Sequence, residues 1–414
     1  MRVLIGSALY PTPLAPRTLG GAEIFARDLA ERLAAAGTAV AALRTGGAGI
    51  PAEETAGGVA VRAIPARNLH PPFEARRDPV RRLLWHALDD WAGDAGRLGH
   101  AIASFRPDVV HTNTLSGLTT ALWRAARAAG VPVVHTLHDY YLTCPRCSRF
   151  SGGARCAGTC GGCRLLTRRR RRATALVDAV VGVSRRILDI HLAEGLFAGA
   201  ATRTVVRNAC SVADLVPGPR YAGGPVTVGF IGRATPEKGL DRLAAAMAGL
   251  PPDRVRLVVA GRVSPPEQAR LRALAPGADL AFLGFVPPAA FYGRVDLVAL
   301  PSLWEEPAAL VVVEALAAGR PVLGSPYGGT PELVRDGENG WIVTPETGAL
   351  RAALAGIADR PEALSAMQDA ALRAGRAYGF DDVVRAYRDL YGRVSATAVP
   401  AGAVAATPAQ RPAA

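Results

Sequence analysis

Short apolar segments alternate with amphipathic stretches through the first half of the chain. Residues 3–5 form an apolar run that predicts a buried strand, and Gly20-Gly21 then opens a helix with Ile24, Leu29 and Leu33 on one face. Further strands are predicted at residues 109–111, 131–136, 179–183 and 204–206, with a helix ended by Gly130 between the first two. This half is therefore predicted to be an α/β domain.

The alternation stops in a Pro/Gly-rich stretch at residues 214–224, which is typical of a link between domains. Strands are predicted after it at residues 227–231, 255–260, 280–282, 297–300, 321–323 and 341–343, with helices beginning near Leu240 and Leu310. Repeated β-then-α units indicate parallel sheets with helices on both faces. We predict an α/β fold of two Rossmann-like, doubly wound domains, residues 1–212 and 226–378, joined by a linker at 213–225. The Ala/Pro-rich residues 396–414 are predicted to be disordered.

Charge is unevenly distributed between the two halves. The formal net charge is +13, and the first 210 residues hold 28 arginines against 15 acidic residues, whereas the remainder holds 20 residues of each sign. An anionic partner is therefore expected for the N-terminal half. No signal peptide and no run of about twenty apolar residues is evident, so we expect a cytoplasmic protein that contacts the inner membrane face peripherally.

Lys238, the only lysine of the chain, lies in a predicted turn between a strand and a helix. The strand ends at Gly232, and Arg233 and Lys238 flank the loop that follows. An anion in this loop would meet a planar guanidinium, an ammonium and the free N–H groups of a helix start. The alternative is an ordinary turn with solvent-facing cations. The loop is thus a candidate phosphate site.

Two carboxylates separated by seven residues follow the strand predicted at 297–300. Glu306 falls in the loop before a helix, and Glu314 about two turns into it. Ionised carboxylates accept hydrogen bonds and suit the hydroxyls of a sugar and a ribose. Further on, the turn at Gly328 and Gly329 is predicted to open a helix whose N–H groups face phosphate.

In their order from Gly20 to about Tyr391, these segments resemble the retaining glycosyltransferases of the two-Rossmann (GT-B) type, specifically family 4. The resemblance implies two domains facing across a cleft, an acceptor domain first and a donor domain second, and a last helix at 379–395 that packs back on the first. It implies that Glu306 holds the transferred sugar, Glu314 the ribose, and Arg233 with Lys238 the diphosphate. The other donor-binding positions that it implies are Gly20, Gly21, Gly232, Gly284, Phe285, Val286, Ala309 and Leu310. Ala308 and Ala309 replace an aromatic residue and a glycine that are usual in the family.

His138 stands in the segment Thr136-Leu-His138-Asp139, which matches a motif near the reacting centre in the same family. The resemblance implies that His138 orients or polarises the sugar or the acceptor hydroxyl and that anomeric configuration is retained. Arg233 and Lys238 would stabilise the departing diphosphate, so no cofactor is expected to be required for catalysis. A lone histidine at a strand end is otherwise structural, and we interpret His111 in that way.

Five of the six cysteines lie within residues 144–163. Cys144, Cys147, Cys160 and Cys163 form two Cys-x₂-Cys pairs, which in a cytosolic protein favour a structural Zn²⁺. Cys156 is a substitute in this ligand set. A disulfide or redox switch and unligated thiols are the alternatives. Cys210 stands far from the cluster and is expected to be a small buried residue.

Five consecutive arginines, Arg168 to Arg172, follow the cysteines. We interpret them as a contact for an anionic or lipid-linked acceptor or for membrane phospholipid, with a solvated helix face as the alternative. Nucleic acid is disfavoured because no aromatic residues interleave with the arginines. The acidic pairs Asp89-Asp90 and Asp381-Asp382 are interpreted as surface acids of helices rather than as metal ligands.

The predicted function is transfer of a sugar from a UDP-, GDP- or dTDP-sugar to a hydroxyl acceptor of a polysaccharide, a lipid-linked molecule or a natural product. Two other functions remain as alternatives. One is a non-catalytic zinc-containing module that binds nucleic acid or membrane, and the other is an epimerase of nucleotide sugars with the same architecture.

Overall fold

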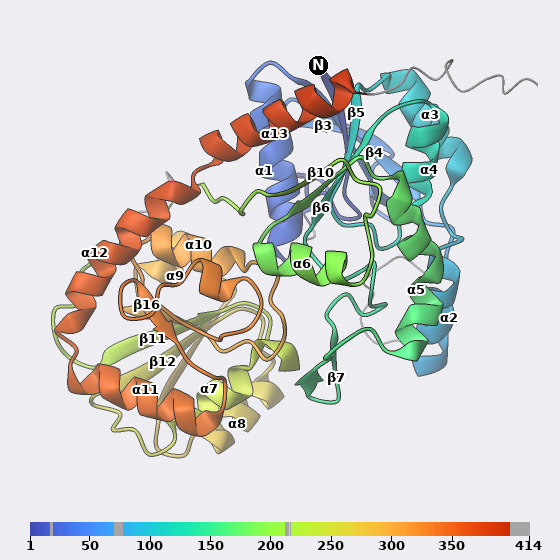
Figure 1. The fold of residues 1–414 in the computed structure, drawn as a ribbon. Helices are drawn as coiled ribbons and strands as arrows, with labels where there is room; N and C mark the ends of the chain where they lie inside the picture. The colour runs from blue at the N-terminus through green and yellow to red at the C-terminus, as the bar shows by residue number, and fades with distance from the viewer. Residues whose placement is uncertain (17–19, 70–77, 212–214, 216, 398–414) are drawn as a thin grey trace, which may run out of the picture.

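The computed structural model describes residues 1–414 apart from 17–19, 70–77, 212–214, 216 and 398–414. It contains two α/β units that lie side by side (Figure 1). The strands of the first sheet are β1 (Arg2–Gly6), β2 (Ala39–Gly46), β3 (Glu53–Ala56), β4 (Val59–Pro65), β5 (Val109–Thr112), β6 (Val133–Leu137), β9 (Ala179–Gly182) and β10 (Thr202–Val205). Their order is β10-β9-β6-β5-β1-β2-β4-β3, and only β3 pairs in the antiparallel sense.

Helices cover both faces of this first sheet, because its central strands are apolar on both sides. They are α1 (Gly21–Ala35), α2 (Pro79–Asp89), α3 (Ala95–Phe105), α4 (Ala121–Ala128), α5 (Gly161–Ala173) and α6 (Arg185–Ala193), with a 3₁₀ turn at Thr174–Leu176. A two-stranded hairpin, β7 (Phe150–Ser151) and β8 (Ala154–Arg155), lies within the cysteine-rich segment.

The second sheet is entirely parallel, with the order β13-β12-β11-β14-β15-β16. Its strands are β11 (Val226–Ile231), β12 (Val255–Ala260), β13 (Asp279–Gly284), β14 (Leu297–Leu300), β15 (Val322–Gly324) and β16 (Gly340–Ile342). The helices are α7 (Leu240–Met247), α8 (Pro265–Leu274), α9 (Pro288–Tyr292), α10 (Leu310–Ala317), α11 (Thr347–Asp359) and α12 (Ala363–Gly375), with 3₁₀ turns at Pro236–Lys238, Thr330–Glu332 and Arg376–Tyr378.

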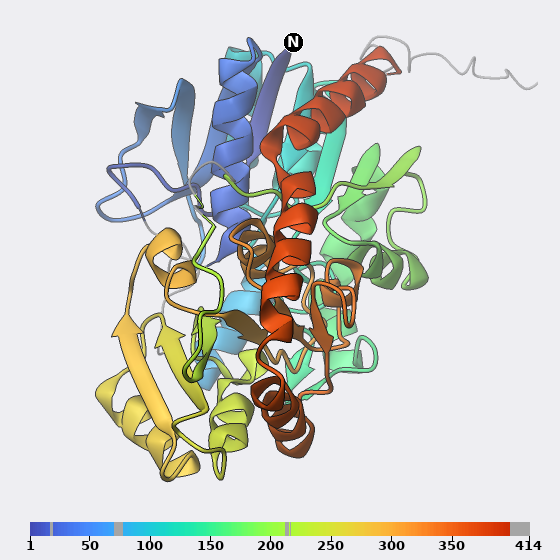
Figure 2. The same cartoon turned by 90° about the vertical axis from the view of Figure 1, so that its left-hand side faces the viewer.

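The last helix, α13 (Phe380–Ala396), crosses from the second unit back to the first (Figures 1 and 2). Its apolar side chains join the core formed by α1 and one face of the first sheet. Two buried hydrogen bonds fix it there, one between Tyr387 and Thr136 at 2.8 Å and one between Tyr391 and His111 at 2.7 Å. The two units are thus tied together by packing as well as by the chain connection.

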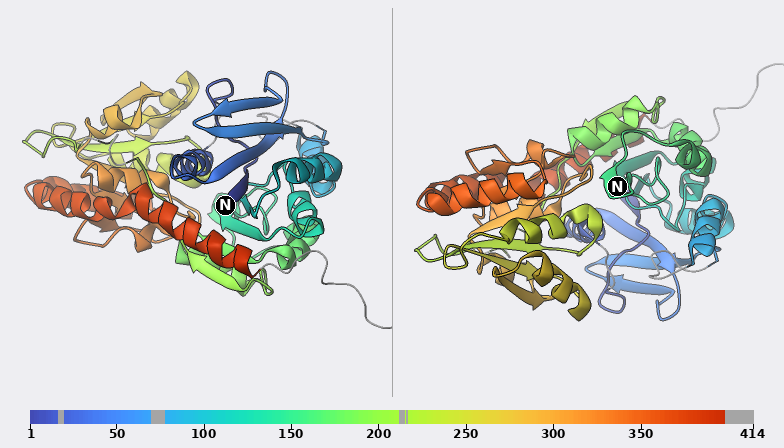
Figure 3. Two further views of the ribbon diagram at one scale, coloured as in Figure 1. Left: turned by 90° about the horizontal axis from the view of Figure 1, so that it is seen from above. Right: turned by 90° about the horizontal axis from the view of Figure 1, so that it is seen from below.

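Each sheet reverses its strand order at one point, between β1 and β5 in the first and between β11 and β14 in the second. Views from above and from below show the two sheets in separate units, with α13 running from one unit to the other (Figure 3). Ligands in such folds bind beyond the carboxyl ends of the strands at the reversal point. A ligand site is therefore expected at the loops after β11 and β14.

The predicted fold class is confirmed. The sequence pattern did not identify the strands and helices within residues 39–105, which are β2, β3, β4, α2 and α3. Residues 213, 214 and 216 of the predicted linker and residues 398–414 of the predicted tail lie outside the described residues. In the part of the chain that the structure describes, no helix is both long and apolar enough to span a bilayer.

Candidate active site

Three neighbouring strands of the second sheet end in glycines whose backbones pack closely. Gly232 after β11 has φ +144°, a conformation that glycine adopts readily, and its N–H bonds to Ala260 O at 3.1 Å. A Cβ on Gly261 would overlap the Gly232 carbonyl, and the Gly261 N–H bonds to Gly284 O at 2.7 Å. The result is a floor of partly exposed glycine backbone at the strand ends. Gly261 was missed from the sequence, although it stands directly after a predicted strand.

Lys238 and Glu306 meet at the reversal point of this sheet. Gly239, with φ +72°, allows the loop after β11 to pack against the carbonyl of Pro301 after β14, where a Cβ would overlap. Lys238 Nζ then lies 2.6 Å from Glu306 Oε2. The same carboxylate oxygen accepts a hydrogen bond from Trp304 Nε1 at 2.9 Å. Two residues from separate motifs thus share one site.

Glu314 lies on α10 and is partly enclosed. Because α10 begins at Leu310, Glu314 stands about one turn into the helix, not two, since the loop after β14 continues to Ala309. Tyr292 donates a hydrogen bond to Glu314 Oε2 at 2.8 Å. Burial raises the pKa of Glu314 to about 7, the Tyr292 hydrogen bond acts against this shift, and the charge of Asp28 on α1 adds to it. This carboxyl group therefore titrates near neutrality and becomes a full acceptor above that pH.

The glycines after β15 do not offer free N–H groups. The Gly328 N–H bonds to Glu305 Oε2 at 2.9 Å and the Gly329 N–H bonds to Glu306 O at 2.7 Å. The turn that follows is a single 3₁₀ turn at Thr330–Glu332 rather than the start of an α-helix. The prediction that these amides face phosphate is wrong, because the loop that carries the two glutamates already occupies them.

The start of α1 faces the start of α10 across the two units. A Cβ on Gly21 would lie 2.8 Å from Leu310 Cβ, so the absence of a side chain lets the two helices approach. Gly20 caps α1, and its N–H bonds to Glu23 Oε2 at 2.9 Å. Burial raises the pKa of Glu23, and the charge of Arg233 acts against this rise. Gly20, Gly21 and Arg233 therefore lie near one another where the two units meet.

His138 follows β6 and is held within the first unit. Its Nε2 lies 3.0 Å from Asn113 Oδ1, and its ring packs against Phe25 with centroids 5.3 Å apart. Burial lowers the pKa of His138 to about 3, so the ring is neutral at physiological pH. His111 is fully buried between Thr136 and Tyr391, which fits the structural role predicted for it.

The loop after β13 supplies the predicted base-lining residues at the edge of the floor. Gly284 ends β13 with φ +67°, and Phe285 is the most exposed large hydrophobic side chain in the described residues, at 81%. Val286 is partly buried against the core of the second unit. An exposed aromatic ring beside glycine backbone can stack on a flat ligand.

Glu305 connects the two units and was missed from the sequence. It pairs with Arg186 at 2.8 Å and with Arg155 of the hairpin at 3.0 Å. Its backbone carbonyl accepts a hydrogen bond from Tyr140 at 2.9 Å. Burial alone would raise the pKa of Glu305, but Arg186, Gly328 and Arg155 together lower it. No sequence signal distinguishes this residue from its neighbour Glu306, because its partners come from distant segments.

The cysteine-rich segment folds as a turn, the β7–β8 hairpin and the start of α5. Cys160 caps α5, and its Sγ accepts a hydrogen bond from the Cys163 N–H at 3.5 Å. Burial, followed by hydrogen bonding to Cys160 and interaction with Cys144, raises the pKa of Cys163 to about 12. The Cys147 thiol is directed toward the Pro145 carbonyl oxygen, 3.9 Å from its Sγ, and not toward the other cysteines. Within the described ranges, no group of three His, Cys, Asp or Glu side chains is arranged to hold a metal ion. Cys210 is buried, as predicted.

The arginine run is not a continuous solvent-facing face. Arg170 is fully buried, and its Nε lies 2.7 Å from Asp90 while its Nη2 lies 3.7 Å from Asp89. Arg171 pairs with Glu194 at 2.7 Å. The interpretation of Asp89-Asp90 as surface acids is wrong, because these carboxylates neutralise Arg170 inside the protein. Arg168 and Arg172 alone of the five are exposed.

Known proteins match the chain over both units. The family model for glycosyltransferase family 4 matches residues 19–199, and the model for glycosyl transferases group 1 matches residues 219–374. A D-inositol 3-phosphate glycosyltransferase of Streptomyces scabiei is 30% identical over 411 residues, covering 90% of this chain and 86% of that protein. The chain belongs to glycosyltransferase family 4. It is a transferase, and neither the binding module nor the epimerase finds support in these matches.

Two further matches place this glycosyltransferase among its relatives. An uncharacterised 42.6 kDa protein from the cps region of Klebsiella pneumoniae is 31% identical over 339 residues, covering 81% of this chain and 88% of that protein. Sucrose-phosphate synthase from Thermosynechococcus elongatus has a TM-score of 0.75 at 20% identity, covering 95% of this chain and 99% of that structure. Anabaena HepE, solved in complex with UDP-glucose, has a TM-score of 0.70 at 19% identity, covering 95% and 100%. The structural matches establish the GT-B fold.

Proposed function

We propose that this glycosyltransferase transfers a sugar from a nucleoside-diphosphate sugar to a hydroxyl acceptor with retention of anomeric configuration. The observation that carries the proposal is the 2.6 Å contact of Lys238 with Glu306 at the reversal point of the second sheet. The Lys238 ammonium can pair with a diphosphate, and the neighbouring Glu306 carboxylate can accept hydrogen bonds from sugar hydroxyls. Solved structures of the same fold bind UDP and UDP-glucose, which makes uridine nucleotides the first donors to test.

On donor binding, Lys238 and Arg233 pair with the diphosphate, and Glu306 turns to a hydroxyl of the sugar. Glu306 keeps its hydrogen bond from Trp304, so its carboxylate stays in place when Lys238 exchanges partners. Glu314, a full acceptor above about pH 7, binds the ribose, and Phe285 lies against the base. The bond from the anomeric carbon to the diphosphate oxygen breaks, and the two cations stabilise the charge that develops.

The acceptor oxygen attacks the anomeric carbon from the face that the diphosphate leaves. A diphosphate oxygen takes the acceptor's proton, and a new glycosidic bond forms as the nucleoside diphosphate departs. Neutral His138 orients the sugar or the acceptor hydroxyl by hydrogen bonding. Its low pKa makes it a donor or acceptor of hydrogen bonds rather than a cation at physiological pH.

The donor class can be tested with a thermal-shift panel of UDP-, GDP- and dTDP-sugars. At least one donor is expected to raise Tm, because a ligand at about 100 times its Kd stabilises the folded state by about 2.7 kcal/mol. The same donor should be consumed slowly in a hydrolysis assay. The proposal fails if no nucleotide sugar shifts Tm and none is consumed.

We also propose a structural Zn²⁺ held by Cys144, Cys160 and Cys163 with either Cys147 or Cys156. Support comes from the contact of Cys160 with Cys163 at the start of α5, and from the interaction of Cys163 with Cys144. The thiols would have to rotate to converge on one ion. Four thiolates around one ion are the usual closed arrangement of structural zinc.

Metal analysis of the purified protein tests this site without using activity. About one equivalent of zinc is expected in wild type and in Cys210→Ser, which lies far from the cluster, and none in Cys163→Ser. A comparison of Cys147→Ser with Cys156→Ser identifies the fourth ligand. Zinc-free wild type, or full zinc in Cys163→Ser, would refute the proposal.

A further inference from the structure

Helix α2 turns an apolar stripe toward solvent. Val80, Leu83, Leu84 and Leu88 are all more than 40% exposed, and their spacing places them on one side of the helix. The opposite side carries Trp85, which is buried. A surface helix normally directs its apolar stripe to the core, so a second apolar stripe in solvent marks a contact surface.

The stripe continues onto the neighbouring helix α5. Trp91, just beyond α2, is 71% exposed, and the Arg169 guanidinium stacks 3.5 Å from the centre of its ring. Leu165 is 73% exposed and lies one turn before Arg169 on α5. The buried pairing of Arg170 with Asp89 and Asp90 locks α5 beside the end of α2. The six apolar side chains of the stripe and Leu69 beside them make up seven of the eleven exposed large hydrophobic side chains in the described residues.

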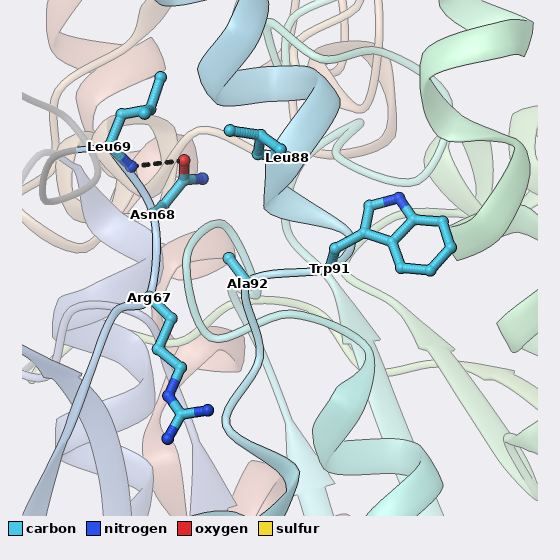
Figure 4. Close-up of a pocket in the computed structure, with 6 residues that line it drawn as sticks. All are labelled: Arg67, Asn68, Leu69, Leu88, Trp91 and Ala92. Carbon is cyan, nitrogen blue, oxygen red and sulfur yellow. Dashed lines mark hydrogen bonds between the residues drawn. The ribbon is translucent and has the colours of Figure 1, made fainter.

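A shallow pocket of about 310 Å³ opens within the region (Figure 4). Its wall includes Leu88 and Leu69, with the aliphatic stem of Arg67 below them, and the Trp91 indole points away from Leu69 at the other end. Arg67 is held by Asp94 at 3.1 Å. The pocket is separate from the donor site described above. Its lining combines the apolar side chains of Leu69, Leu88, Trp91 and Ala92 with the polar Asn68 and Arg67, so the pocket extends the apolar surface of α2.

Charge around the apolar stripe is predominantly positive. Arg81 and Arg82 are exposed on α2, and Arg168 and Arg172 are exposed on α5. Asp89 and Asp90 are buried and neutralise Arg170, so they do not offset these exposed cations. Asp78 is exposed, but its carboxylate caps α2 by accepting from the Val80 N–H at 2.7 Å. The net result is leucine and tryptophan bordered by arginine.

We propose that this surface, made of the α2 stripe with Trp91 and Leu165 and the arginines around them, docks on an anionic lipid bilayer. The helix lies in the plane of the interface, the leucines enter the boundary between headgroups and acyl chains, and the arginines pair with lipid phosphates. Tryptophan and arginine are the residues that favour this boundary. The proposal uses no donor-site residue, so it stands or falls independently of the sugar-transfer proposal.

Docking on this surface also replaces the earlier interpretation of the arginine run. Arg168 and Arg172 contribute, whereas Arg170 and Arg171 serve internal ion pairs. The apolar contact comes from α2, which the sequence pattern did not reveal. In this orientation the first unit, rather than the nucleotide-binding unit, faces the lipid, and an acceptor carried by the membrane would reach the cleft from that side.

Sedimentation of the full chain with vesicles tests the proposal. Wild type is expected to bind vesicles of phosphatidylcholine mixed with phosphatidylglycerol, to bind phosphatidylcholine alone weakly, and to lose affinity as salt rises. Leu83→Glu/Leu84→Glu should lower partitioning at least about tenfold, because two apolar side chains that enter the lipid are replaced by carboxylates that anionic headgroups repel. Leu274→Glu, which changes an exposed leucine at the end of α8 in the second unit, is the matched control and should bind like wild type.

A second variant separates charge from packing. Arg81→Gln/Arg82→Gln should weaken binding to the anionic vesicles while leaving the weak binding to phosphatidylcholine unchanged. Thermal unfolding and donor-induced stabilisation should match wild type in every variant, since the altered side chains are exposed. Absence of wild-type binding to anionic vesicles, or wild-type binding by Leu83→Glu/Leu84→Glu, would overturn the proposal. A concentration-dependent dimer that the same leucine variant abolishes, with no vesicle binding, would instead assign the surface to a second copy of the chain.

Discussion

Replacing Lys238 with alanine is expected to lower kcat for sugar transfer by about 10²- to 10³-fold, the usual cost of removing one preorganised group that stabilises a developing anion. Lys238 is the cation nearest to the carboxylate that we assign to the sugar, at 2.6 Å from Glu306. No other lysine exists to replace it. Steady-state transfer with the donor selected by the thermal-shift panel measures the effect.

The fold of the Lys238→Ala variant is expected to persist. Glu306 keeps its hydrogen bonds from Trp304 at 2.9 Å and from Ser302 at 3.3 Å, so its carboxylate is not left without donors. Lys238→Arg retains the charge but changes the geometry, and should therefore retain more activity than Lys238→Ala. Activity of Lys238→Ala within a few-fold of wild type would be incompatible with a role on the leaving diphosphate.

Gly21→Ala is expected to lower kcat/KM by about ten- to a hundredfold. The new Cβ would lie 2.8 Å from Leu310 Cβ, so α1 and α10 must separate or repack across the cleft. Overpacking of this kind costs about 1–3 kcal/mol. Gly99→Ala is the matched control, because a Cβ on this glycine of α3 in the first unit would meet no heavy atom within 4 Å and the residue is not part of the donor site. We expect Gly99→Ala to behave like wild type in the same assay.

A second substitution makes the Gly21 prediction specific. Leu310→Ala keeps Cβ but removes Cδ2 and Cγ, which would lie 3.1 and 3.6 Å from the new Cβ, so Gly21→Ala should lower kcat/KM less in the Leu310→Ala background than in wild type. The two single effects should therefore not be additive. Equal behaviour of Gly99→Ala and Gly21→Ala, or strict additivity, would show that the close approach of the helices does not matter for turnover.

The donor loops could be predicted because their signals are local. Gly232, Lys238 and Glu306 each stand within a few residues of the end of an apolar run, and parallel strands bring their carboxyl ends to one edge. The contact between Lys238 and Glu306 depends on a pairing 68 residues apart in sequence, which the sheet order supplies. Pattern alone places the two loops on the same edge but cannot predict the ion pair.

Side chains paired across long sequence separations were the ones that pattern reasoning misplaced. Arg170 belongs to a run of arginines that the sequence predicts to be exposed, yet it is buried and forms an ion pair with Asp90, 80 residues earlier. The sequence does not distinguish Glu305 from any other acid before a helix, because its partners Arg155 and Arg186 belong to the other unit. For Arg170 and Glu305 the error comes from a partner that no local window contains. Helix α2 is a different case, because Val80, Leu83, Leu84 and Leu88 have helical spacing but the spacing does not show that this side faces solvent.

The central claim is that Lys238 recognises the diphosphate of the donor, and calorimetric titration tests it most directly. Wild type and Lys238→Ala are each titrated with UDP and with uridine, or with the corresponding pair for the nucleotide that the panel selects. We predict that wild type prefers the diphosphate by at least about tenfold, since one charge-assisted contact contributes about 1.4 kcal/mol or more. This preference should fall by at least about tenfold in Lys238→Ala, with Arg233 still in place, while affinity for the nucleoside is unchanged. An undiminished preference for UDP in Lys238→Ala would contradict the account.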